Sequence, residues 1–90
     1  MNIDVYDTYA TSKAGNTIHF DVFLPIGGSK ETALQYARVF LESIGEAGDE
    51  LKSERCTFCH TEAAHPNVEA EIALSGHFIL QMEGCPKPYR

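Results

Sequence analysis

The residues with the clearest chemical potential are cysteines and histidines in the second half of the chain. Cys56, Cys59 and His60 form a CxxCH motif, and Cys85 follows near the end of the sequence. Two thiols separated by two residues can bind one metal ion or react with each other. A histidine directly after them also makes the motif typical of c-type haem attachment. Zinc binding, thiol redox chemistry and haem attachment are therefore the three interpretations of this segment.

Zinc is the leading interpretation because the segment concentrates the sulfur and nitrogen donors that tetrahedral zinc prefers. Cys56 and Cys59 supply half of such a site, Cys85 a third ligand, and one histidine the fourth. The predicted metal ligands are Cys56, Cys59, His60, His65 and Cys85. The second half of the site is not a matched pair of ligands, however. Small, buried and reduced thiols are therefore the alternative that involves no metal.

The redox and haem interpretations have less support. A thiolate is favoured at a helix N-terminus, but the helix start marked by Pro66 lies several residues beyond Cys59. Covalent haem is normally attached in exported proteins, and the first ten residues do not resemble a signal peptide. We therefore expect no haem and a cytoplasmic location, where thiols stay reduced.

A second candidate site lies on the predicted β-hairpin. If Asp4, Tyr6, His19 and Asp21 share one face, a carboxylate and an imidazole become neighbours across the strands. An imidazole oriented by a carboxylate is a common starting point for general acid–base catalysis. A solvated sheet face displays the same polar residues without any chemistry, and this is the simpler explanation.

Composition limits the classes of function. Ninety residues make one domain, and the net charge of −6 disfavours binding to nucleic acid. No apolar run reaches the length of about 20 residues that a membrane span needs. A domain of this size buries a modest core, so a bound metal or a homodimer contact would add stability.

Periodicity and turn residues predict six elements in the order β-β-α-β-α-β. Ser29 is the expected N-cap of the first helix, and Gly45 and Gly76 are the expected stops of the two helices. The expected elements are strands at 2–9 and 17–24, a helix at 30–44, a weak strand at 51–55, a helix from 66 to 75 and a strand at 78–83, with an irregular tail from about 86.

These elements predict an α+β, two-layer sandwich. One sheet of about four strands carries both helices on one face, because each helix has a single apolar stripe. The last two strands are expected to be neighbours, since a helix of about ten residues joins them. Neighbouring strands would bring Cys85 back to Cys56 and Cys59.

Several sequence blocks resemble a small bacterial family of domains of unknown function. The blocks are VYDTY at 5–9, HFDVF at 19–23, SIGEAG at 43–48, CTFCH at 56–60 and MEGC at 82–85. The resemblance implies a compact two-layer α+β domain and no activity. The sequence therefore predicts a small non-enzymatic module stabilised by zinc. The alternative is an enzyme that uses the two CxxC thiols or the His19 and Asp21 face.

Overall fold

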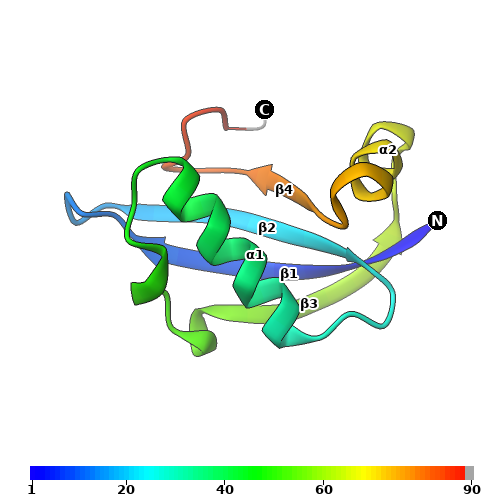
Figure 1. Ribbon diagram of the computed structural model, residues 1–90, viewed down its shortest axis with the longest axis horizontal. Coiled ribbons are helices and arrows are strands. Elements are labelled where there is room, and N and C mark those ends of the chain that lie inside the picture. The colour runs from blue at the N-terminus through cyan, green and yellow to red at the C-terminus, as the bar shows by residue number, and fades with distance from the viewer. Residues whose placement is uncertain (89–90) are drawn as a thin grey trace.

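The chain folds around one antiparallel four-stranded sheet with the strand order β3-β1-β2-β4. This arrangement comes from a computed structural model that describes residues 1–88 (Figure 1). The α+β class and the element order β-β-α-β-α-β are confirmed. The elements are β1 (Asn2–Thr11), β2 (Thr17–Pro25), α1 (Lys30–Ser43), the 3-10 turns η1 (Gly48–Glu50) and η2 (Ser53–Arg55), β3 (Cys56–Ala63), α2 (Pro66–Ser75) and β4 (Phe78–Gln81).

The hairpin of β1 and β2 forms the centre of the sheet, and its alternating side chains supply two separate cores. One face carries Ile18, Phe20, Val22 and Leu24, which pack against α1. The other face carries the apolar residues Ile3, Val5 and Phe23, which pack against α2. Because successive strand residues point to opposite faces, the two sets lie on opposite sides of the sheet.

The two helices therefore cover opposite faces, and the prediction that both lie on one face is wrong. The face of α1 includes Ala33, Ala37 and Leu41, whereas α2 contributes Val68 and Ile72 to the second core. Figure 1 shows α1 crossing the strands and α2 beside β4. The physical reason is that the hairpin carries buried apolar residues on both faces, so one layer of helices leaves half of that surface uncovered.

The helix boundaries follow the predicted capping residues. The Ser29 side chain accepts a hydrogen bond from the backbone N–H of Thr32, at 3.1 Å, and begins α1. Pro66 lies in the first turn of α2, and Gly76 ends that helix in the left-handed conformation at φ +82°. These caps satisfy backbone groups that a helix end leaves unpaired.

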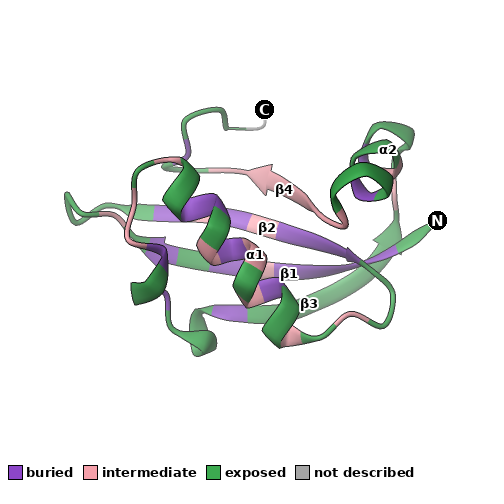
Figure 2. Ribbon diagram, in the orientation of Figure 1, coloured by how far each residue is buried: buried purple, intermediate pink, exposed green. Residues whose placement is uncertain are grey.

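The third and fourth strands differ most from the prediction. In the expected weak strand at 51–55, residues 51 and 52 belong to no regular element, residues 53–55 form the turn η2, and β3 begins only at Cys56. β4 ends at Gln81, two residues before the predicted end. Contrary to expectation, β3 and β4 are not neighbours: they form opposite edges, with the central hairpin between them. Figure 2 shows β3 exposed along almost its whole length.

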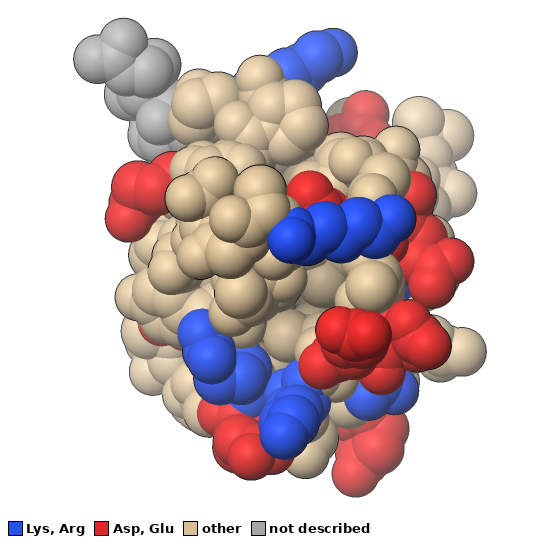
Figure 3. All heavy atoms as spheres, turned by 90° about the vertical axis from the view of Figure 1, so that its left-hand side faces the viewer, with Lys and Arg blue, Asp and Glu red and all other residues tan. Residues whose placement is uncertain are grey.

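The surface is acidic overall but not uniformly so. At the end of the molecule that bears the hairpin turn, lysine and arginine side chains stand among acidic ones (Figure 3). Among the described residues, this end therefore offers no continuous basic patch to a phosphate backbone. Within residues 1–88, no helix is both long enough and apolar enough to cross a membrane.

Two glycines with almost the same backbone conformation provide a test of this packing. Gly84 (φ +82°) follows β4, and a Cβ atom there would lie 2.2 Å from the carbonyl oxygen of Thr17, whereas Gly15 (φ +89°) has nothing within 4 Å. Gly15→Ala should lower the free energy of unfolding by about 1–2 kcal/mol, the cost of a left-handed alanine. Gly84→Ala should cost roughly 1–3 kcal/mol more because the backbone of β2 must shift. Urea unfolding measures both, and equal losses would contradict the close contact of the Gly84 turn with β2.

Candidate functional site

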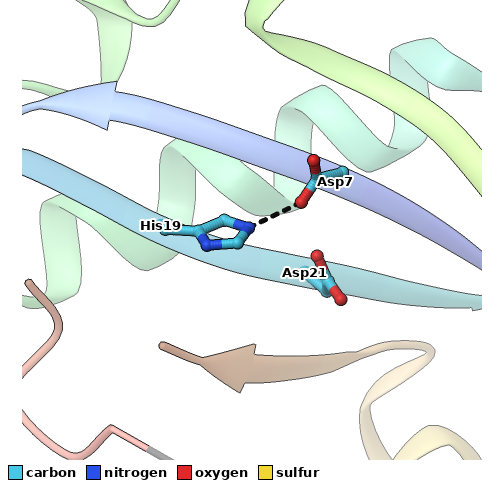
Figure 4. Close-up of side chains that lie close together, drawn as sticks. All are labelled: Asp7, His19 and Asp21. Carbon is cyan, nitrogen blue, oxygen red and sulfur yellow. Dashed lines mark hydrogen bonds and ion pairs between the residues drawn. The ribbon is translucent and has the colours of Figure 1, made fainter. Parts of the chain in front are cut away.

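Three side chains converge on the face of the hairpin that is turned away from α1. Asp7 pairs with Asp21 across β1 and β2, and Tyr9 pairs with His19 in the same register. The ligand atoms of Asp7, His19 and Asp21 all lie within 4.8 Å of one another. Figure 4 shows them projecting from the two strands toward one point. They lie beyond the apolar patch that α2 covers, so an uncovered half of the sheet face carries this cluster.

His19 is held on three sides. Its Nε2 lies 2.6 Å from Asp7 Oδ1 and its Nδ1 lies 3.3 Å from Glu83 Oε1. The ring of Tyr9 stacks on the imidazole with a centroid distance of 4.2 Å and an interplanar angle of 9°. Only 14% of the His19 side chain is exposed. Burial lowers the pKa of His19, but its hydrogen bonds to Asp7 and Glu83 outweigh that effect and raise the pKa.

Asp21 has the most perturbed carboxyl group of the cluster. Burial, followed by the nearby Asp7 carboxylate, raises its pKa to about 7. Its Oδ1 is buried and has no hydrogen-bond partner among residues 1–88. A buried polar atom without a partner costs free energy, and so do two like charges at close range. The cluster therefore favours a bound proton or another cation between its carboxylates.

This site corrects the predicted membership of the hairpin face. The expected group of Asp4, Tyr6, His19 and Asp21 is wrong. Successive side chains of β1 point to opposite faces, so Asp4 and Tyr6 lie on the face under α1, away from His19 and Asp21. Tyr6 packs in the core under α1 and donates a hydrogen bond to the carbonyl of Gly28 at 3.1 Å. Asp4, on the same side as Tyr6, accepts a hydrogen bond from Thr61.

The partners that the sequence interpretation missed are Asp7 and Glu83. Asp7 could have been found from the hairpin turn, which sets the register that pairs Asp7 with Asp21. Glu83 gave no such signal, because it reaches His19 only through the pairing of β2 with β4. That pairing is extended by backbone hydrogen bonds from His19 to Glu83 and from Met82 to His19, at 2.8 and 3.0 Å. The expectation that His19 is merely solvated is also wrong.

The five predicted metal ligands do not form one site in the described residues. Cys56 is fully buried at the start of β3, beneath α1, and its sulfur accepts a hydrogen bond from Thr8 at 3.5 Å. Cys85 is buried beyond β4 at the other edge of the sheet and donates to the backbone carbonyl of His19 at 3.3 Å. The central strands separate these two sulfurs, so the prediction that Cys85 meets the CxxC thiols is wrong.

The remaining predicted ligands lie along β3 and at its end. Cys59 and His60 are exposed neighbours, with 3.2 Å between Cys59 Sγ and His60 Nδ1. His65 is the N-cap residue of α2. Cys56 and Cys59 sit in one strand, where three residues span about 10 Å, beyond the roughly 7 Å limit between Cα atoms of a disulfide. A disulfide within the CxxC motif is therefore incompatible with this strand.

Comparisons with known proteins give a family and a fold. A family model described as a domain of unknown function, DUF2024, matches residues 1–82. The NMR structure of protein NE1680 from Nitrosomonas europaea, a structural genomics target, is similar at 46% sequence identity with a TM-score of 0.83. That match covers 94% of this chain and 99% of the other. No functionally curated protein matches.

The protonated state of Asp21 predicts how stability depends on pH in metal-free protein. Between about pH 4, near the carboxyl pKa in an unfolded chain, and a pH of about 7, the folded chain holds a proton that the unfolded chain has lost. The free energy of unfolding should therefore fall as pH rises through this interval. The raised pKa of His19 also makes the free energy of unfolding fall as pH rises, at the upper end of this pH interval.

Urea unfolding in a chelator at a series of pH values measures this dependence. Asp21→Asn, which cannot ionise, should flatten the slope, whereas Asp49→Asn on the exposed turn η1 should keep it. An unchanged slope in Asp21→Asn would contradict the protonated carboxyl.

Proposed function

The chain belongs to the DUF2024 family, and because that family name assigns no activity we propose, from the geometry, that the domain is a small non-enzymatic module that binds a divalent transition-metal ion. Zn²⁺ is the leading ion, and its ligands are Asp7, His19 and Asp21. The observation that carries the proposal is the convergence of one imidazole and two carboxylates within 4.8 Å.

The charge balance of the cluster supports a cation at this position. Asp7 and Asp21 face each other across the hairpin, and Glu83 adds a third carboxylate beside His19. Within residues 1–88, no lysine or arginine is among the groups that shift the pKa of Asp21. A divalent ion would take the place of the proton on Asp21 and would give its buried Oδ1 the partner that it lacks.

The donor set favours zinc over magnesium or calcium. Imidazole nitrogen suits zinc and other late transition metals, whereas magnesium and calcium prefer oxygen ligands alone. Three protein ligands would leave one position of a tetrahedral zinc ion to water. Glu83 would then act as an outer partner that accepts from His19 Nδ1–H. The ion would be bound by His19 Nε2, which would give up its contact with Asp7 Oδ1 to a bond with the metal that both residues share.

General acid–base catalysis is the second candidate function for the same residues. It is favoured by the pKa of about 7 of Asp21, which places a proton donor beside an oriented imidazole near neutral pH. This candidate needs no metal, so the metal-binding measurement below separates the two.

Calorimetric titration of chelator-treated protein with ZnCl₂ should show one ion bound per chain. His19→Ala and Asp21→Asn should abolish measurable binding, because each removes a ligand. Glu83→Gln should weaken it by roughly 10–100-fold, as expected for an outer partner. Asp49→Asn is the matched control and should bind as the unmodified chain does, with circular dichroism confirming that each variant is folded.

Two outcomes would overturn the proposal. One is zinc binding that persists in both His19→Ala and Asp21→Asn. The other is loss of binding in Cys59→Ser with retention in Asp21→Asn, which would assign the ion to the CxxCH motif instead.

A further inference from the structure

An irregularity in the pairing of β3 with β1 lies at Cys59. Phe58 pairs with Tyr6, but the next paired residue is His60, opposite Val5. Cys59 is therefore the extra residue of a β-bulge. In a regular strand, Cys59 and His60 would point to opposite faces. The bulge cancels that alternation and brings both side chains to one side, and bulges commonly re-aim side chains in this way.

The bulge creates a chain of contacts through three side chains. Cys59 Sγ lies 3.2 Å from His60 Nδ1, and His60 Nε2 lies 2.5 Å from Glu62 Oε1. Glu62 lies two residues further along the strand, on the same face as His60. A nucleophile within reach of a base, which a third group orients, is the arrangement that activates cysteine and serine nucleophiles. With Nε2–H donated to Glu62, Nδ1 is the nitrogen that accepts from the thiol.

We propose that Cys59 is a nucleophilic thiol that exchanges with low-molecular-weight disulfides. His60 is its proton acceptor and Glu62 is a positioning residue. As the Cys59 sulfur attacks one sulfur of the disulfide, His60 Nδ1 takes the thiol proton. The substrate S–S bond breaks, and the departing sulfur leaves with the bonding electron pair and receives that proton from His60. Cys59 ends in a mixed disulfide and one small thiol is released, so atoms and electrons balance.

The positions of the other cysteines determine the product. Cys56 and Cys85 are buried, and burial raises the pKa of each thiol. Neither can reach Cys59, because Cys56 lies about 10 Å along the same strand and Cys85 lies at the opposite edge of the sheet. With no second thiol in the chain to displace the small partner, the mixed disulfide persists until an external thiol removes it.

The position of Cys59 gives a disulfide room to approach. The residue is exposed, and β3 is an edge strand with β1 as its one neighbour in the described sheet. Cys59, His60 and Glu62 are not among the proposed metal ligands, so this inference does not rest on the proposed function. A charge on His60 is close enough to Asp21 to lower the pKa of that carboxyl.

Reaction with 5,5′-dithiobis(2-nitrobenzoic acid) in the presence of a chelator tests the proposal. The native chain should show one fast thiol, which mass spectrometry should locate at Cys59, and two slow ones. Its rate constant at pH 7 should exceed that of a synthetic peptide of residues 57–63, in which Cys59 is the only thiol, by at least about tenfold. The peptide keeps Cys59 next to His60 but lacks the bulge, so it isolates the contribution of the fold.

Variants assign the roles of the neighbouring residues. His60→Gln should lower the rate of the folded chain about tenfold, toward that of the peptide. His65→Gln, which removes an exposed histidine at the start of α2 whose side chain makes no cap hydrogen bond, should leave the rate unchanged. Glu62→Gln should give an intermediate rate, and Glu62→Asp should recover part of the loss, which a purely structural role for the side chain would not produce.

Three results would overturn the proposal. They are a peptide that reacts as fast as the folded chain, a His60→Gln variant as fast as the unmodified protein, and a mixed disulfide located at Cys56 or Cys85. Circular dichroism of each variant separates a loss of reactivity from a loss of folding.

Discussion

The structure depends on one constraint: the central hairpin is apolar on both of its faces. A strand that is buried on two sides cannot be satisfied by a single layer of helices. The two helices must therefore pass on opposite sides of the sheet, α1 over one face and α2 over the other. Because α2 is short and covers only part of its face, the rest of that face keeps polar residues, and there Asp7, His19 and Asp21 meet.

Local signals in the sequence were sufficient for most elements. The apolar alternation of 17–24, the stripe of the first helix and the glycine and proline boundaries each depend on neighbouring residues alone. The third strand was misplaced for a physical reason. Its residues after Cys56 are all exposed on a sheet edge, so burial imposes no alternation on them. A strand of this kind is held by its backbone pairing with β1. Backbone pairing does not require particular side chains, so the sequence does not mark the strand clearly.

The site was harder to predict than the elements that carry it. His19 and Asp21 were recognised, but their partners depend on pairings between strands. Asp7 requires the register of the hairpin, and Glu83 requires knowledge that β4 adds to β2 at the edge. For the cysteines, the sequence predicted a shared site that the structure does not contain within the described residues. Proximity in sequence suggested a shared ion, whereas strand order separates Cys56 from Cys85.

The contacts of His19 also differ in how far apart they lie along the chain. Asp7 is 12 residues away, within one hairpin, whereas Glu83 is 64 residues away. A hairpin closes early and locally, but an edge strand of four residues docks only after the rest of the chain is in place. Short edge elements are also the first to open in a folded domain. An opening of β4 would therefore remove one carboxylate from the imidazole and leave the other bound, so His19 would change its electrostatic environment without the domain unfolding.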